Sequence, residues 1–225
     1  MKKKVMAFAT IALLVMMALT AADYYDTGSQ IFMINAGVDI PLSVSFKDES
    51  SSSFVTNTGI GMDGTHINVG GYGSIDYEVF SSSKFALGGE IGYQFNYCAD
   101  GVLFTQVPMA FKVSYVPLQG TFEIPISLGA GFSYMTYNEK SIMSPTLMAE
   151  IGFRFFPTEN WGFGIKSGIK ATFELYATNP KKTGIGTFIP VHLFASYRHY
   201  GKNENEKIYT NCTFYLFYLF TICLL

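Results

Sequence analysis

Residues 84–96 are KFALGGEIGYQFN, and residues 121–134 are TFEIPISLGAGFSY. In both stretches an apolar residue alternates with a small or polar one. Successive side chains of a β-strand point to opposite faces, so this alternation gives each strand one apolar face and one small or polar face. A helix is disfavoured because the apolar spacing is two and glycine is frequent. The two stretches therefore predict β-strands.

The same alternation continues over most of residues 31–200. In the first of these segments, we expect Val44 on the apolar face and Ser43 on the opposite face. The segment from Trp161 to Leu175 alternates as cleanly as the two quoted stretches. Together the segments predict eight strands: 31–46, 66–80, 85–96, 102–116, 122–134, 146–156, 161–175 and 184–197.

The connections between these segments alternate in length. Short ones follow the even-numbered strands, at 81–83, 117–120 and 157–160, and longer ones follow the odd-numbered strands, at 47–65, 96–101, 138–141 and 177–183. Short turns at one rim and longer loops at the other are typical of an up-and-down transmembrane barrel. The predicted fold is therefore all-β, an antiparallel up-and-down transmembrane β-barrel of about eight strands.

Alternation alone does not decide which face meets water, since a soluble lipocalin-like barrel turns its apolar face inward. The polar face here is mostly Gly, Ser and Thr, whereas a solvated surface is about a quarter to a third charged. Aromatic residues also gather near segment ends, as expected at a membrane–water boundary. We therefore expect the apolar face to contact lipid. We expect the lumen to hold a charge network of both signs, made of Asp39, Asp76, Glu78, Glu90, Lys112, Glu123, Glu150, Arg154, Lys166, Lys170, Glu174 and Arg198.

The N-terminus has the pattern of a secretory signal. Lys2, Lys3 and Lys4 precede an uncharged apolar stretch at 5–19, and small residues at 20–22 precede Asp23. This predicts a signal peptide at 1–22, cleaved near Ala22, with an N-terminal membrane anchor as the alternative. Residues 23–30 would then be an N-terminal periplasmic segment, and residues 31–200 the barrel.

Composition excludes other classes. Only 14% of the 225 residues are charged, against about a quarter in an ordinary soluble domain. The net charge of −2 falls to about −5 without the leader, and no basic patch appears, so nucleic acid is not an expected partner.

The C-terminal end, residues 201–225, departs from the alternating pattern. A polar linker at 201–207 leads to residues 208–225, which carry no charged side chain. Three interpretations stay open: a ninth strand or strand pair, a membrane-associated helix, or a non-native extension from an altered reading frame.

The leader, the eight segments and the loop asymmetry resemble the small outer-membrane barrels of the OmpW, OmpX and OmpA-barrel type, and also spirochaete surface proteins of the same build. The resemblance is architectural, and no residue motif transfers a functional site. It implies recognition of a last strand ending in an aromatic residue by the barrel-assembly machinery. Residues 189–197 match such a strand, ending near Tyr197, although the chain continues beyond it.

Catalytic signals are weak. His192 falls on the inward face with Ser196, but four residues along a strand separate two side chains by roughly 13 Å, too far for a proton relay. No His/Cys cluster has the spacing of a metal site, and we expect no cofactor.

The favoured hypothesis is a non-enzymatic protein of the bacterial outer membrane. Its partners would be outer-membrane lipid and, through the loop from Lys47 to Thr65, host or cell-surface molecules. A narrow conduit for small or apolar solutes is the alternative, and a lipid-modifying enzyme is a third hypothesis.

Overall fold

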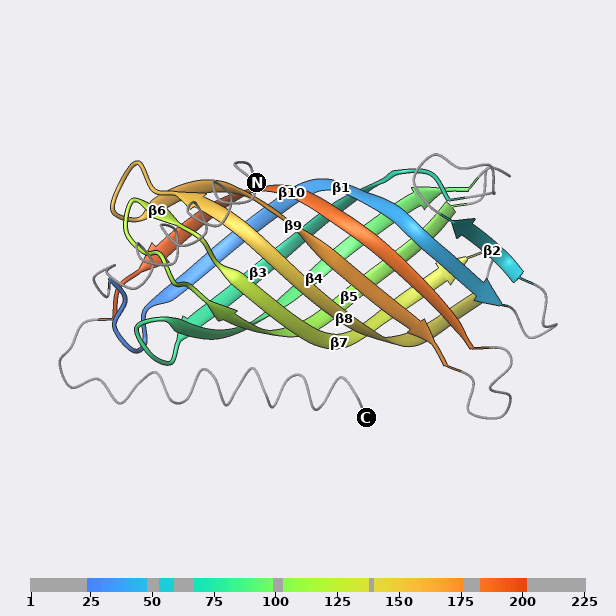
Figure 1. Cartoon of the computed structure of the whole chain (residues 1–225), viewed down its shortest axis with the longest axis horizontal. Helices are drawn as coiled ribbons and strands as arrows, with labels where there is room; N and C mark the ends of the chain where they lie inside the picture. The colour runs from blue at the N-terminus through green and yellow to red at the C-terminus, as the bar shows by residue number, and fades with distance from the viewer. Residues whose placement is uncertain are drawn as a thin grey trace, which may run out of the picture.

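In the described part of the chain, ten strands form one antiparallel sheet that closes into a barrel (Figure 1). The computed structural model describes residues 24–47, 53–58, 67–98, 103–137, 140–175 and 183–201. The strands are β1 (Gln30–Lys47), β2 (Ser53–Thr58), β3 (Gly70–Phe80), β4 (Phe85–Tyr97), β5 (Leu103–Tyr115), β6 (Phe122–Glu123), β7 (Ile126–Tyr137), β8 (Lys140–Phe155), β9 (Trp161–Glu174) and β10 (Gly184–His199). Within these described ranges, no helix is long and apolar enough to cross a membrane.

The wall of the barrel is an up-and-down meander. Its strands pair in the order β1, β3, β4, β5, β7, β8, β9, β10, and β10 pairs with β1 from Gln30↔His199 to Ser45↔Ile185 to close the ring. β2 and β6 lie off this ring, which leaves eight strands in the wall. Closure satisfies the backbone groups that an open sheet edge would leave unpaired. The predicted eight-stranded antiparallel barrel is confirmed.

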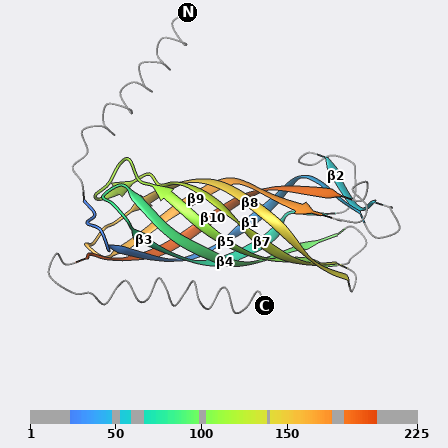
Figure 2. The same cartoon turned by 90° about the horizontal axis from the view of Figure 1, so that it is seen from below.

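The two ends of the barrel differ (Figure 2). The end that carries the short connections β3–β4, β5–β6 and β8–β9 also carries residues 24–29 and 200–201, and we call it the turn end. The opposite end, which we call the loop end, carries the connections between β1 and β3, β4 and β5, β7 and β8, and β9 and β10. One connection at the loop end is short, because only two residues separate Tyr137 from Lys140. The predicted connection at 138–141 is therefore too long, since β8 already begins at Lys140.

The first connection is partly β-structure. β1 runs for 18 residues and continues past the pairing with β3, and its last part pairs with β2 from Ser43↔Thr58 to Lys47↔Ser53. Figure 1 shows β2 at the loop end, beside the tip of β1. The predicted loop at 47–65 therefore begins as a β-hairpin extension of the wall.

One prediction of side-chain direction is wrong. Val44 is fully buried inside the barrel and Ser43 is exposed, the reverse of what we expected. The register of β1 against β10 shifts between Pro41 and Ser43. A one-residue bulge moves every later side chain to the other face, and the bulge left no mark in the alternation itself.

The segment that begins at Phe122 is also not one strand. Pairing is interrupted at Ile124 and Pro125, because proline has no N–H to donate to the ladder. β6 pairs only with β8, and Gly152 N donates to Pro125 O across the interruption at 2.9 Å. The wall stays continuous although the strand is divided.

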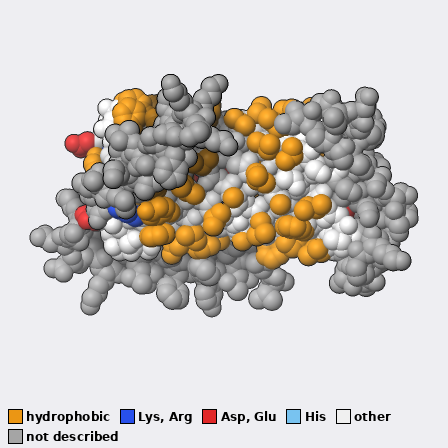
Figure 3. Space-filling view, viewed as in Figure 1, with side chains coloured by type: hydrophobic (Ala, Val, Ile, Leu, Met, Phe, Trp, Pro, Cys, Tyr) orange, Lys and Arg blue, Asp and Glu red, His pale blue; other side chains and the backbone are white. Residues whose placement is uncertain are grey.

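The outer surface of the wall is apolar. Figure 3 shows hydrophobic side chains spread along the described wall on one face of the barrel. Leu193 is 67% exposed and Leu128 is 63% exposed, whereas large apolar residues in soluble proteins are mostly buried. This surface would be unfavourable in water and suits a hydrocarbon environment.

The predictions for the two chain ends fall outside the described residues. These are the signal peptide at 1–22, residue 23 of the adjoining segment, and residues 202–225 of the tail. They remain predictions.

Candidate functional site

The lumen gathers the charges of the strands. Every Asp, Glu, Lys and Arg on a barrel strand whose side chain the structure describes is at most 7% exposed. These are the twelve residues that the sequence assigned to the inner face: Asp39, Asp76, Glu78, Glu90, Lys112, Glu123, Glu150, Arg154, Lys166, Lys170, Glu174 and Arg198. Period-two alternation places them inside, since each occupies a position opposite to the outward apolar residues of its own strand.

Five of these residues form a central cluster: Asp76, Glu90, Lys112, Glu150 and Lys166. Lys112 Nζ lies 2.6–3.0 Å from an oxygen of each of the three carboxylates. Lys166 Nζ lies 2.8–3.5 Å from the same three groups. The cluster draws side chains from β3, β4, β5, β8 and β9, so its ion pairs join opposite sides of the lumen. Two ammonium groups thereby share three carboxylates in a site where an unpaired charge would be costly.

A second group of ion pairs lies nearer the turn end. Arg154 Nη2 is 2.9 Å from Glu78 Oε2, and Arg198 Nη1 is 2.9 Å from Glu123 Oε1. The Tyr25 hydroxyl donates to the same Glu123 oxygen at 2.6 Å. Burial and the neighbouring Glu123 carboxylate raise the pKa of Tyr25, so its phenol remains a protonated donor.

Aromatic rings surround Arg198 at the turn end. The guanidinium carbon lies 3.7 Å from the ring centre of Phe156, 4.6 Å from Tyr24 and 5.4 Å from Tyr200. Arg198 also donates to the Gly120 carbonyl at 3.0 Å. Cation–π contacts of this kind are worth about 0.5–2 kcal/mol each, and here they join residues from both ends of the described chain.

On the loop side of the central cluster, Lys170 pairs with Asp39 and donates to Gln94 Oε1 at 2.6 Å. Tyr72 separates this pair from the central cluster. Its ring stacks on His192 with centroids 4.3 Å apart, and its hydroxyl donates to Glu90 Oε1 at 2.5 Å. Glu174 is buried beyond Lys170, at the loop end of β9.

Two apolar clusters close the lumen on either side of the charges. The turn-end cluster consists of Tyr25, Ile31, Met33, Phe80, Ala86, Val116 and Phe194, with Tyr200 packed against it. The loop-end cluster consists of Val44, Ile67, Cys98, Phe104, Met135 and Phe188, with Ile142 packed against it. Between them, the cavity beside the central cluster measures only about 10 Å³, room for about one water molecule. At that point the described lumen therefore contains no open conduit.

Inward-facing glycines make room for large neighbours. A Cβ at Gly92 would lie 2.5 Å from Tyr72 Oη, and a Cβ at Gly129 would lie 2.5 Å from Met148 Cγ. Their missing side chains accommodate Tyr72 and Met148. At these two positions the glycines leave no space for a solute.

Replacing Gly92 with alanine is expected to lower the free energy of unfolding by about 1–3 kcal/mol. The added methyl group would push against the Tyr72 hydroxyl, which the Glu90 hydrogen bond and the His192 stack hold in place. Gly73→Ala is the matched control, because a Cβ there meets its nearest atom, Asn35 O, at an ordinary 3.7 Å. In urea unfolding in lipid vesicles, the free energy of unfolding of the Gly73→Ala control should stay within about 0.5 kcal/mol of the wild-type value. Equal stability of the two variants would contradict this account.

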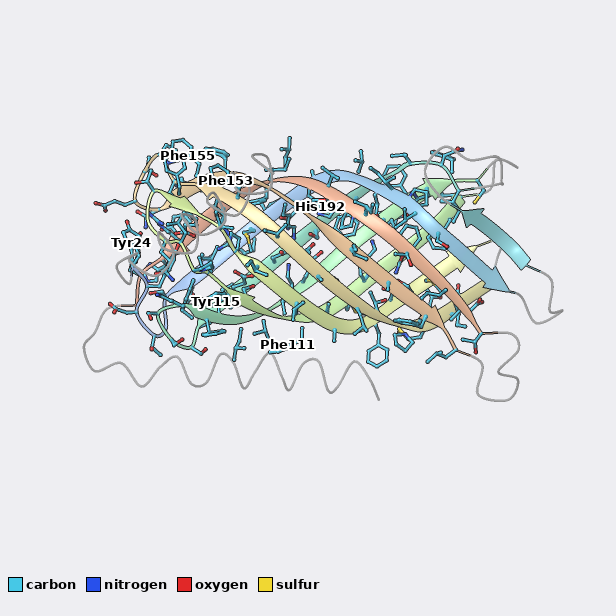
Figure 4. The ribbon with its side chains drawn as sticks, in the orientation of Figure 1. Tyr24, Phe111, Tyr115, Phe153, Phe155 and His192 are labelled. Carbon is cyan, nitrogen blue, oxygen red and sulfur yellow. The ribbon has the colours of Figure 1, made fainter. Side chains whose placement is uncertain are left out.

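His192 and Ser196 are the two residues that the sequence singles out as a possible catalytic pair. His192 is 1% exposed and lies within the barrel (Figure 4), and the Ser196 hydroxyl lies in the same wall. In the described lumen, neither His192 ring nitrogen nor Ser196 Oγ has a hydrogen-bond partner. Among the described residues, no group of three His, Cys, Asp or Glu side chains could hold a metal ion.

Sequence reasoning missed two features of the lumen. It did not foresee the apolar clusters, since Phe104, Phe188 and Phe194 occupy the otherwise small or polar face of their strands. It also gave residues 23–30 no role, although Tyr25 fills the turn end. The adjacent tyrosines at 24 and 25 in a polar segment were the one available signal.

A protein-family model matches residues 16–197, which take in the whole wall except the last two residues of β10. This chain belongs to that family. The match covers more than half of the chain and includes every charged lumen residue except Arg198.

Two relatives from spirochaetes are similar in sequence. An uncharacterized protein of Treponema pallidum (strain Nichols) is 27% identical over 159 residues, 69% of this chain and 70% of the relative. An uncharacterized protein of Borreliella burgdorferi is 28% identical over 145 residues, 59% of this chain and 61% of the relative. The predicted resemblance to spirochaete proteins is confirmed.

Solved outer-membrane proteins are similar in structure. OprG from Pseudomonas aeruginosa is 13% identical with a TM-score of 0.48, covering 80% of this chain and 99% of its own. Neisserial surface protein A is 12% identical with a TM-score of 0.45, covering 76% and 97%. Ail of Yersinia pestis, in complex with the heparin analogue sucrose octasulfate, is 14% identical with a TM-score of 0.43, covering 77% and 99%. The fold assignment rests on the strand pairing of this chain.

Proposed function

We propose that this protein is a non-enzymatic integral protein of the bacterial outer membrane that uses its barrel as an anchor and presents its loop end for adhesion or host contact. One observation supports the membrane assignment above all others. The twelve charged residues of the strands lie inside, and large apolar side chains cover the outer face of the wall. A water-soluble barrel has the opposite arrangement.

The filled lumen favours an anchor over a channel. A permeating solute would have to break the ion pairs of Lys112 and Lys166 in the central cluster and displace the Tyr72–His192 stack. It would also have to pass the apolar clusters on either side. Removing one partner of a buried ion pair costs about 3–5 kcal/mol, and several pairs would have to break together.

The length of the strands supports presentation at the loop end. A tilted strand needs about 9–11 residues to cross the hydrocarbon core. β1 has 18 residues, and β8 and β10 have 16 each. With the turn end at the bilayer surface, the surplus extends the wall and the β1–β2 hairpin beyond the lipid, where a partner can reach them.

Heat-modifiable gel mobility combined with surface proteolysis of intact cells tests location and orientation. A folded barrel in the outer membrane should migrate differently before and after boiling. External protease should cut within residues 48–65 and spare the turns at 81–83 and 117–120. Recovery in the aqueous periplasmic fraction, or external cutting at those turns, would overturn the proposal.

Planar-bilayer recording separates the anchor from the alternative of a narrow conduit. We expect no discrete conductance steps from the purified barrel at neutral pH. Steps that persist in repeated preparations would favour transport.

Exchange of residues 48–65 for a glycine–serine linker of equal length tests the adhesion role. The variant should keep its heat-modifiable mobility, since the β1–β10 and β1–β3 pairings that close the wall lie outside the exchanged stretch. Binding of intact cells to host-cell surfaces should fall by at least about tenfold relative to the parent, if this loop supplies the contact. Unchanged binding would exclude the loop as the contact.

A further inference from the structure

The six residues before β1 lie across the opening of the barrel at the turn end. Tyr25 is 1% exposed, and its ring stacks on Phe80 with centroids 4.0 Å apart and an interplanar angle of 12°. Its hydroxyl reaches Glu123 inside the lumen. Tyr24 is 41% exposed. It lies at the rim, at the left end of the barrel in Figure 4. One side chain of this segment therefore enters the barrel, and its neighbour stays at the rim.

The segment contacts the wall through backbone hydrogen bonds at one end and through side chains at the other. Its backbone pairs with the end of β3 at Gly28 and Ser29, since Gly28 N donates to Phe80 O and Phe80 N donates to Ser29 O, both at 2.8 Å. From Tyr24 to Thr27 each hydrogen bond to the barrel involves a side chain. Tyr24 N donates to Gln119 Oε1, Arg198 Nη2 donates to the Tyr24 hydroxyl, and Thr27 Oγ1 donates to the Ser81 carbonyl. A few such contacts are weaker than a full strand ladder, so this stretch can open while the wall stays paired.

Gly28 has the geometry of a hinge. Its φ of +91° lies in the left-handed region, which residues with a Cβ rarely adopt, and open space surrounds the position of its missing Cβ. Rotation there would lift Tyr24–Thr27 away from the opening and leave the pairing of Ser29 with Phe80 intact.

Tyr25 separates external water from the buried ion pairs. The small cavity beside the central cluster is lined by Glu78, Arg154 and Ser127 on its polar side and by Met33 and Phe194 on its apolar side. Met33 and Phe194 also belong to the turn-end cluster that Tyr25 completes. The cavity and the opening therefore lie on either side of this cluster.

We propose that residues 24–29 form a plug that closes the turn end of the barrel and opens about Gly28 while the barrel remains folded. The plug would reversibly seal the turn end of a barrel whose lumen holds paired charges. The first and last residues that the structure describes lie at this end. Opening of the plug would admit water to the ion pairs of Glu123, Arg154 and Glu78 without breaking the β-ladder. This inference goes beyond the anchoring function and does not depend on what the loop end binds.

The first measurement uses the mature wild-type protein in lipid vesicles. Hydrogen exchange should be at least about tenfold faster at the Gly28 amide, which donates to Phe80 O at 2.8 Å, than at the amides of Met33 and Ile34 in β1, because the segment opens locally. Exchange as slow as in β1 would show that the plug does not open on its own and would overturn the proposal.

The second measurement follows a reporter thiol beneath the plug. Val116 is fully buried in the turn-end cluster, so Val116→Cys is introduced into a protein whose native cysteines at 98, 212 and 223 are serine. A water-soluble maleimide should label this thiol slowly. Tyr25→Ala should raise the labelling rate by about a hundredfold, since removing a buried aromatic side chain weakens the closed state strongly. Tyr24→Ala, the adjacent control, should change it much less.

Tyr25→Phe separates the ring from the hydroxyl. This variant keeps the stack on Phe80 and loses the donor to Glu123, so its labelling rate should fall between those of the parent and Tyr25→Ala. All variants should keep the heat-modifiable mobility of a folded barrel. An unchanged rate in a folded Tyr25→Ala protein would overturn the proposal. Should Tyr25→Ala fail to fold, the hydrogen-exchange comparison in the wild type decides.

Discussion

Lys112→Met is expected to lower the free energy of unfolding by about 3–5 kcal/mol, since removing one partner of a buried ion pair leaves an uncompensated charge. Lys112 Nζ contacts all three carboxylates of the central cluster within 3.0 Å, and its side chain is 2% exposed. Methionine retains much of the aliphatic stem, so the loss is mainly electrostatic. Urea titration in lipid vesicles, monitored by tryptophan fluorescence, measures the loss. Trp161 is the only tryptophan in the sequence.

The double variant Lys112→Met with Glu150→Gln is the matched control. It restores the net charge of the central cluster and should recover at least about 1 kcal/mol of the loss, because residues in one ion-pair network do not behave additively. Wild-type stability of the single variant, or additive losses in the double variant, would show that the cluster does not act as a network.

Leu193→Arg is expected to lower the free energy of unfolding by about 2–4 kcal/mol in lipid vesicles, the cost of a charge on the lipid face near the bilayer midplane. Leu193 lies on the outer face near the middle of the wall, opposite Ala36 on β1 and Ile165 on β9, and it is 67% exposed. In a soluble protein, a side chain this exposed would accept arginine at almost no cost.

Two variants control for position and size. Leu193→Phe keeps an apolar side chain in lipid and should be close to neutral. Leu103→Arg places the same charge at the loop-end start of β5, where the cost should fall to about 0–1 kcal/mol. If all three variants have wild-type stability, the outer face does not contact lipid.

The alternation predicted the fold because a barrel wall repeats one local rule. In the strands of the wall, such as those that begin at Phe85 and Trp161, the charged residues occupy the positions between outward apolar residues. The inner face could therefore be assigned strand by strand. The inward direction of all twelve charged side chains follows from this alternation. Their pairing does not, because Lys112 on β5 meets Asp76 on β3 and Glu150 on β8 only across the closed lumen.

The departures arise where a local irregularity or a tertiary contact overrides the pattern. The bulge between Pro41 and Ser43 reversed the direction of Val44, and a bulge has no sequence signature in a run of alternating residues. Phe194 is inward although its strand alternates correctly, so its apolar character alone would have suggested the outer face. Tyr25 lies outside every strand, and its role emerges only when the barrel closes around it.

Labelling from the hydrocarbon phase tests the central claim directly. The folded protein is placed in vesicles whose acyl chains carry a photoactivatable carbene precursor, and the modified residues are mapped by mass spectrometry. We expect modification at Ile91, Leu128, Ile151 and Leu193 and none at Glu90, Lys112 or Lys166. Modification of the charged residues with sparing of the apolar ones would contradict the account, because the barrel would then be turned inside out.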